Sequence, residues 1–292
     1  MFRLQLFLFL ILLIPNLHSD SFSIMNLNAQ NLFDTLDDEG KDDKAFLPLK
    51  SKESFEHINS CHNINVKAWR MECLYLDWNE ETKEAKLANL VKNIISYQGN
   101  GADIIALQEI ENENILEQLF SLLKPYGYID FVLLEGTDKR GIDTAFISRF
   151  QMNNPQLHYV NFSPEFEKKD TRPILEVSIL FNEQNIRIYN VHFPSNLNDL
   201  QVRIESFDLL KELHISHSDA SIALGDFNLN SKDDKRESVY KNQEDQWFVA
   251  HREGCQSCKG SYYYGYGKSW DFLDTIFVSR GRGIAFDKDS ID

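Results

Sequence analysis

The stretch Ser221-Ile-Ala-Leu-Gly-Asp-Phe-Asn228 is the most informative part of this chain. Its apolar run Ile222–Leu224 predicts a buried strand, and Gly225 interrupts that run before two polar residues, Asp226 and Asn228. Residues i and i+2 of an extended chain project to the same side, so the carboxylate and the amide leave the strand end together. Such a pair can orient water and bind a phosphoryl oxygen or a hard metal ion. The same residue types also favour tight turns, so a simple turn is the alternative.

Strand-like and helix-like segments alternate along the rest of the chain, which is typical of α/β or mixed-sheet proteins. Besides the strand at Ile222, we expect strands over Phe22–Leu27, Asp103–Leu107, Phe131–Leu134, Thr144–Ser148, Ile174–Phe181, Ile186–Val191 and Thr275–Val278. We expect helices over Glu80–Tyr97, Asn112–Leu123 and Leu197–His214. Residues 34–75 form a long acidic excursion, and residues 261–267 form a Tyr-rich loop. Because no flexible linker interrupts the pattern, residues 20–292 are predicted to form one domain.

The composition restricts the possible functions. The chain has 292 residues, 42% of them hydrophobic, and its formal charge is 30 − 45 = −15. An acidic surface repels polyanions, which argues against tight, metal-free, nonspecific binding to nucleic acid. It leaves room for an enzyme whose acidic cleft holds a divalent cation.

The N-terminus has the pattern of a targeting segment. Arg3 precedes the apolar run Leu6–Ile14, which is followed by Pro15 and by small Ser19. The run is short for a membrane span, and its basic-then-apolar order is typical of a secretory signal peptide, predicted over residues 1–19. We therefore expect a secreted or periplasmic protein, with an uncleaved membrane anchor as the alternative.

Four cysteines in an exported protein suggest disulfide bonds. Proximity in sequence predicts the pairs Cys61–Cys73 and Cys255–Cys258. The alternative is a four-cysteine zinc site, but the spacing from Cys61 to Cys73 is too wide for the usual zinc knuckle.

Several expected strands end in polar residues that could converge on one site. These residues are Asn28, Glu109, His192, Asp226 and Asn228, and Asp274 lies in a further strand segment, 269–278. Asn28 could instead form a turn, Glu109 could serve as a helix N-terminal charge, and His192 could be a structural residue. Asp274 lies between apolar residues, where a buried carboxylate is costly without a hydrogen-bond partner.

The order of these motifs resembles the endonuclease/exonuclease/phosphatase superfamily of metal-dependent phosphoesterases. The matching pieces span nearly the whole mature chain: Asn28-Ala-Gln-Asn-Leu-Phe-Asp34, Asp103-Ile-Ile-Ala-Leu-Gln-Glu109, Arg140-Gly-Ile-Asp-Thr-Ala145, Asn190-Val-His192, Gly225-Asp-Phe-Asn228 and Phe272-Leu-Asp-Thr-Ile-Phe-Val-Ser279. The resemblance implies a four-layer α/β sandwich, in which two central mixed sheets are flanked by helices. It places the site at one edge of the sheets.

The resemblance also implies a role for each matching residue. Glu109 would be the principal ligand of Mg²⁺, or of Mn²⁺ or Ca²⁺, with Asn28 beside it. His192 would contact the phosphate or assist its leaving group. Asp226 would orient or deprotonate the attacking water, and Asn228 would hold a phosphoryl oxygen. Three further residues would contact substrate: Asp143, Arg172 and Asn190.

One departure from the family pattern concerns the C-terminus. Family members generally end in a Ser-Asp-His segment whose His is paired with the Asp that matches Asp274. This chain has no His after His251. We therefore expect the domain to be incomplete at its C-terminus. The alternatives are that His251 substitutes for the missing residue or that activity is reduced.

The sequence as a whole predicts an exported, Mg²⁺-dependent phosphoesterase, with a nuclease-like phosphodiesterase that acts on nucleic acid as the first choice. A phospholipase or sugar-phosphate phosphatase on the same scaffold is the second. A catalytically impaired, disulfide-stapled binding protein is the alternative from a different class. The Tyr-rich loop could stack on bases or could pack against the surface. We expect a monomer without a stable protein partner.

Overall fold

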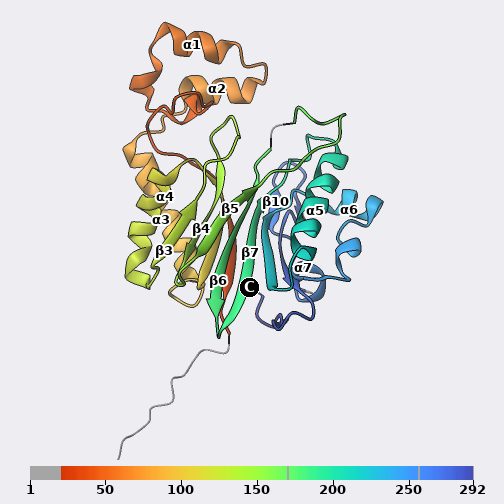
Figure 1. Ribbon diagram of the computed structural model, residues 1–292. Helices are drawn as coiled ribbons and strands as arrows, with labels where there is room; N and C mark the ends of the chain where they lie inside the picture. The colour runs from red at the N-terminus through yellow and green to blue at the C-terminus, as the bar shows by residue number, and fades with distance from the viewer. Residues whose placement is uncertain (1–20, 170, 256, 292) are drawn as a thin grey trace, which may run out of the picture.

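The computed structural model of the protein describes residues 21–291, apart from residues 170 and 256 (Figure 1). The predicted signal peptide lies outside these residues. Within them, no helix combines the length and the apolar character needed to cross a membrane.

Two mixed sheets form the centre of the molecule. The first sheet has the order β1-β2-β4-β3, with bounds Ile24–Leu32, Ile104–Ile110, Asp143–Ser148 and Asp130–Leu133. The second has the order β5-β6-β7-β8-β12-β9, with bounds Asn153–His158, Ile174–Phe181, Gln184–His192, Ala220–Asp226, Asp274–Ser279 and Trp247–Val249. The pairs β1–β2 and β7–β8 are parallel, so in each sheet two neighbouring strands end at the same edge.

Helices cover the outer faces of both sheets, with α3 and α4 on one side and α5, α6 and α7 on the other (Figure 1). The helices are α1 (Phe55–His62), α2 (Lys67–Tyr75), α3 (Glu80–Ser96), α4 (Glu113–Leu123), α5 (Leu200–Ile215), α6 (Ser231–Glu237) and α7 (Ala250–Glu253). Short 3-10 turns lie at Lys44–Phe46, Leu49–Lys52, Lys124–Tyr126 and Lys241–Gln243. Asparagine side chains cap α3 and α4: Asn79 Oδ1 accepts the N–H of Thr82, and Asn112 Oδ1 accepts that of Ile115.

Alternation along the central strands explains the layers. In β2, Ile105 and Leu107 pack with α3 and α4, while Ile104 and Ala106 pack between the two sheets. A strand that is buried on both faces reads as a continuous apolar run, as residues 104–107 do. The arrangement confirms the predicted four-layer α/β sandwich.

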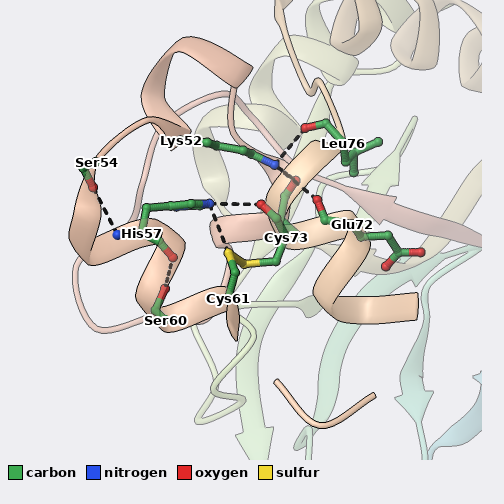
Figure 2. The surroundings of a disulfide bond; sticks show 9 residues. Lys52, Ser54, His57, Ser60, Cys61, Glu72, Cys73 and Leu76 are labelled. Carbon is green, nitrogen blue, oxygen red and sulfur yellow. Dashed lines mark hydrogen bonds between the residues drawn. A yellow bond between two sulfur atoms is a disulfide. The ribbon is translucent and has the colours of Figure 1, made fainter. Parts of the chain in front are cut away.

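The acidic excursion contains α1 and α2, which lie beyond the end of the first sheet (Figure 1). The Cys61–Cys73 disulfide joins these two helices, with a Cα–Cα distance of 5.6 Å (Figure 2). Buried Lys52 donates from Nζ to the carbonyl oxygens of Ala45 and Leu76, both at 2.7 Å. A disulfide and a buried lysine therefore hold a segment that has little apolar core of its own.

Both predicted disulfides are confirmed, the second being Cys255–Cys258. Their sulfurs are bonded to one another, which excludes the four-cysteine zinc site. The expected strands and helices are all present, most with shifted bounds. The elements that we did not expect are α1, α2, β5, α6, β9, α7 and a hairpin of β10 (Tyr262–Tyr264) and β11 (Ser269–Asp271).

Candidate active site

The candidate site is the polar end of the seam between the two sheets. Along β2, β7 and β8, the side chains that face the seam are apolar deep in the molecule, for example Ile104, Ile188 and Ile222. Alternation places Gln108 and His192 on this same face nearer the strand ends. Because these strands end at neighbouring edges, the seam changes from an apolar core into a cluster of polar side chains.

The deepest polar layer joins the two sheets through three amide side chains. Gln108 Nε2 donates to Asn26 Oδ1 at 2.8 Å and to Asn190 Oδ1 at 2.7 Å. Asn190 Nδ2 in turn donates to the carbonyl oxygens of Leu107 and Ala145. Gln108 and Asn190 are fully buried. This layer fixes the ends of β1, β2 and β7 relative to one another, directly beneath the charged groups.

Above it lie the carboxylates. Asn28 Nδ2 donates to Glu109 Oε1 at 3.4 Å and to Asp226 Oδ2 at 3.2 Å. His192 Nε2 lies 3.9 Å from each of the same two oxygens. One residue from each of β1, β2, β7 and β8 therefore meets in one place, although their positions span nearly 200 residues of sequence.

A bulge in β2 brings Glu109 into this group. Strict alternation would send Glu109 to the helix-covered face, together with Ile105 and Leu107. Instead, Glu109 has φ = 63°, and the register shifts between Gln108 and Ile110. Ile110 then takes its place in the α3–α4 core. A left-handed backbone at a non-glycine residue is strained, and such strain concentrates at functional sites.

The glycine of the opening motif is required by close packing. Gly225 has φ = 147°, and a Cβ at this position would lie 2.0 Å from the carbonyl oxygen of Val191. Only glycine permits this approach of β8 to β7. Asp226 follows at once, and its Oδ1 accepts the N–H of Asn228 at 2.9 Å. The motif therefore does form a turn, and this turn aims the Asp226 carboxylate. Its role in an active site stays a prediction.

The electrostatics of the group fit a divalent cation. Burial, followed by the neighbouring Asp274 and Glu109 carboxylates, raises the pKa of Asp226 to about 8. Burial also raises the pKa of Asp274. Three crowded carboxylates and an imidazole nitrogen are donors that suit a hard or borderline metal ion, whose charge would relieve their repulsion. Glu109 and Asn28 would hold such an ion, with Asp226 beside it.

The surroundings of His192 favour its neutral imidazole form. Burial, and then the positive charges of Arg172 and Arg140, lower its pKa well below the usual range. Its Nδ1 is buried without a hydrogen-bond partner. The sequence reasoning named Arg172 but did not single out Arg140, which lies inside a quoted motif. The two arginines act on His192 electrostatically, and guanidinium groups are well suited to bind a phosphate.

Asp274 has a different partner from the one expected. Its Oδ1 accepts from Asn26 Nδ2 at 3.1 Å, across the seam from the other sheet. His251 does not pair with Asp274, because its Nδ1 lies 2.8 Å from Thr275 Oγ1 and its ring stacks on Phe272. Burial lowers the pKa of His251 to about 4. Asn26 was missed by the sequence reasoning, although its alternation with Asn28 could have indicated it.

The predicted substrate contacts occupy different environments. Asn190 is committed to the inter-sheet layer, which favours a positioning role. Asp143 is buried, accepts the N–H of Gly136 at 3.0 Å, and has a pKa raised to about 7 by burial and by Glu135. Arg172 Nε lies 3.2 Å from Asp138 Oδ2. Asn228 donates to the carbonyl of Phe193, so one of its amide hydrogens holds the strand exit.

An aromatic hairpin extends from the Asp274 side of the site. Ser261 Oγ accepts the N–H groups of Leu273 and Asp274, which fastens the start of the hairpin to β12. The side chains of the hairpin are exposed rather than packed: Tyr262, Tyr263, Tyr264, Tyr266 and Trp270. The interpretation of this segment as a packed surface loop is therefore wrong.

Known proteins share this architecture. A mannosyl-6-phosphatase from Bacteroides thetaiotaomicron superposes with a TM-score of 0.53 at 15% identity, covering 89% of this chain and 86% of that one. A TDP2 from D. rerio, humanized by 14 mutations, gives 0.51 at 16% identity, covering 91% and 85%. At these identities the likeness shows the fold alone. No curated protein sequence matches the chain.

A sequence profile of the Endonuclease/Exonuclease/phosphatase family matches residues 74–289, which is well over half of the chain. Members of this family are generally hydrolases that act on phosphoesters, and they typically use divalent metals. The matched segment includes Glu109, His192, Asp226 and Asp274, while Asn28 lies before it. The chain belongs to the endonuclease/exonuclease/phosphatase family.

Proposed function

We propose that the protein is an exported, divalent-metal-dependent phosphodiesterase of the nuclease type, with Mg²⁺ as the metal. The observation that carries the proposal is the meeting of Glu109 Oε1, Asp226 Oδ2 and His192 Nε2, with the imidazole 3.9 Å from both carboxylates. The bound metal would offset negative charge on the phosphate as the reaction proceeds. Export rests on the N-terminal sequence pattern alone.

The protein's own groups have distinct tasks in this proposal. Asp226 orients the attacking water and accepts its proton as the new P–O bond forms. Neutral His192 donates a hydrogen bond to a phosphate oxygen, and Arg140 and Arg172 attract the phosphate to the same side. The P–O bond to the leaving group breaks, so a phosphodiester and water give a phosphomonoester and an alcohol. Asp274 and Asn26 position the site from opposite sheets.

The aromatic hairpin favours nucleic acid as the substrate. Exposed aromatic rings stack on bases with little sequence preference, and this hairpin is fastened beside Asp274. A sugar-phosphate phosphatase or a phospholipase is the second candidate. A protein with a formal charge of −15 repels polyanions such as nucleic acid, so the charge is at least as compatible with a small phosphate ester or a phospholipid as substrate. The phosphatase reading is in line with the named activity of the Bacteroides thetaiotaomicron neighbour.

Hydrolysis of single-stranded DNA, plasmid DNA, bis-p-nitrophenyl phosphate and p-nitrophenyl phosphate, each with Mg²⁺ or with EDTA, tests the proposal. We expect Mg²⁺-dependent turnover of the diesters, and its loss in Asp226→Ala. Tyr263→Ala should raise KM for DNA and leave the small diester unaffected. Leu180→Ala is the control, since this exposed residue lies near the opposite end of the second sheet from His192. Turnover of the monoester alone supports the phosphatase, and absence of turnover on all four supports a binding protein.

A further inference from the structure

A second group of carboxylates lies close to the candidate active site in sequence but is separate from it. Asp38 and Asp43 belong to the acidic excursion after β1, and Glu111 follows the end of β2. One carboxylate oxygen from each of the three lies within 4.8 Å of the others. We call these three residues the loop cluster. Neither the proposed reaction nor the family motifs assign it a task.

Two members of the loop cluster, Asp43 and Glu111, are buried, and each has only one of its two carboxylate oxygens in a hydrogen bond. Glu111 is 2% exposed and Asp43 is 1% exposed. Glu111 Oε2 accepts the N–H of Asp34 at 2.6 Å, and Asp43 Oδ2 accepts that of Asp38 at 2.8 Å. The other oxygens, Glu111 Oε1 and Asp43 Oδ1, are buried without a hydrogen-bond donor. Leaving a buried carboxylate oxygen without a partner is costly, so these two oxygens call for a ligand that the chain does not supply.

The chain also supplies no positive charge to the loop cluster. Within the described residues, Asp38, Asp43 and Glu111 form no ion pair with lysine, arginine or histidine. Lys41, in the same loop, pairs with Glu135 instead. The side-chain donor that reaches the cluster is the neutral amide of Asn112, whose Nδ2 lies 3.1 Å from Asp38 Oδ2. The cluster thus brings three carboxyl groups together without a lysine, arginine or histidine partner among the described residues.

We propose that Asp38, Asp43 and Glu111 bind a calcium ion, distinct from the metal of the candidate active site. All three donors are carboxylate oxygens, which hard cations prefer, and neither imidazole nor thiolate is among them. Two ligands come from a loop and the third from a strand end. Ca²⁺ accepts six to eight oxygens in flexible geometry, whereas Mg²⁺ demands a near-ideal octahedron. Water or backbone carbonyls would complete the shell.

Calcium at this position would fasten the acidic excursion to the sheet. Asp38 and Asp43 lie before α1, while Glu111 lies between β2 and α4. An ion shared by these segments stabilises the folded chain by mass action, because the unfolded chain has no such site. The inference does not depend on the phosphoesterase reaction, since binding and stability are measured without a substrate.

The test uses the full mature chain and calcium alone. Thermal unfolding is followed in EGTA and in excess Ca²⁺, and bound calcium is counted by equilibrium dialysis. At about 100 times Kd we expect the Tm of the wild type to rise by roughly 5–10 °C. Asp43→Asn should abolish this rise and remove one bound ion. Asp42→Asn is the matched control, because the neighbouring Asp42 is exposed and outside the cluster, and it should keep both.

Two further measurements make the outcome decisive. In EGTA, Asp43→Asn should be at least as stable as the wild type, because Asn keeps an acceptor for the N–H of Asp38 and removes one crowded charge. In Glu109→Gln, which weakens the other cluster, the calcium-dependent rise should persist. The proposal is overturned if wild-type Tm is the same in EGTA and Ca²⁺, if Asp43→Asn and Asp42→Asn respond alike, or if Glu109→Gln abolishes the rise. If Asp43→Asn does not fold, Glu111→Gln takes its place.

Discussion

Two groups of carboxylates lie on either side of Ile110 and differ in what surrounds them. Glu109 meets Asn28, and its Oε1 lies 3.9 Å from His192, at the polar end of the seam between the sheets. Glu111 meets Asp38 and Asp43 in a buried loop cluster, where one of its oxygens has no donor. The left-handed backbone at Glu109 and the bulge at this point send the two glutamates into separate environments.

The contrast teaches that partners, rather than the number of carboxylates, decide what such a cluster can do. In the first group, an imidazole and amides surround the acids, and two arginines are near enough to depress the pKa of His192. These are the kinds of side chain that can bind a phosphate group and take part in its hydrolysis. In the second group, two buried oxygens lack a donor, and no lysine, arginine or histidine of the described residues pairs with the acids, which suits a bound ion that holds the chain in place. The experiments below separate the two tasks.

The largest effect is expected from Glu109→Gln. Removing the proposed principal metal ligand should lower the proposed Mg²⁺-dependent turnover of a diester by about 10³-fold or more, which corresponds to about 4 kcal/mol of transition-state stabilisation. Steady-state kinetics over a range of Mg²⁺ concentrations measures this loss. Glu113→Gln is the control, because Glu113 is exposed in the first turn of α4 and contacts neither cluster. Turnover in Glu109→Gln within tenfold of the wild type would contradict the assignment.

The next largest effect concerns the amide layer beneath the first group. Asn190→Leu keeps the volume but leaves the carbonyls of Leu107 and Ala145 without their donor. Buried, unsatisfied polar groups of this kind should cost about 2–4 kcal/mol of unfolding free energy, measured by urea denaturation. Asn185→Ala, at the exposed start of the same strand, should cost less than about 1 kcal/mol. Equal losses in the two variants would show that the layer does not support the site.

Much of the fold was predictable from the sequence, because the central strands and the long helices carry strong apolar patterns. The run Ile104–Leu107 and the helix face of Leu87, Leu90 and Ile94 are buried as their patterns require. The helices α6 and α7 have few apolar residues, and β9 is apolar but only three residues long, too short to show a periodic pattern. The helices α1 and α2 are fixed largely by a disulfide and a buried lysine, which leave no periodic pattern in the sequence.

The candidate site was predictable in membership but not in geometry. Asn28, Glu109, His192 and Asp226 could be named because polar residues directly follow apolar strands. The bulge that turns Glu109 into the seam could not be deduced, since alternation alone assigns it to the opposite face. Asn26, Gln108 and Arg140 were missed because their roles depend on contacts between the two sheets or on loops distant in sequence. The loop cluster was visible only as an acidic stretch.

A smaller effect is expected at the boundary of the first group, in His251→Gln. The ring bonds Thr275 rather than Asp274, so diester turnover should stay within about threefold of the wild type. The folded pKa of about 4 lies below the usual 6.5, so between these values the unfolded chain binds the extra proton. Wild-type stability should therefore fall as the pH drops from about 6.5 to about 4, by up to about 3 kcal/mol. The variant should lack this part of the acid loss.

Urea denaturation at several pH values and steady-state kinetics check both halves of this expectation. Asp226→Asn is the positive control for turnover, because Asp226 is the proposed acceptor of the water's proton. A loss of more than about 30-fold in His251→Gln would place His251 in the active site, in the role that the family pattern gives to a C-terminal histidine. An unchanged acid profile would show that the buried ring is protonated as readily in the folded chain as in the unfolded one.

The smallest effect sharpens the second half of the comparison, at the helix cap beside the loop cluster. Asn112 caps α4 through Oδ1, while its Nδ2 donates to Asp34 and Asp38. Asn112→Ala should cost about 1 kcal/mol for the cap, and more in EGTA than in Ca²⁺, because without calcium the carboxylates depend on that amide. Asn79→Ala removes the cap of α3, and the Asn79 amide donates to Asp77 rather than to a member of the cluster, so its cost should be the same in both conditions. If calcium leaves the cost of Asn112→Ala unchanged as well, the amide serves only as a cap and the loop cluster does not use it to hold its charge.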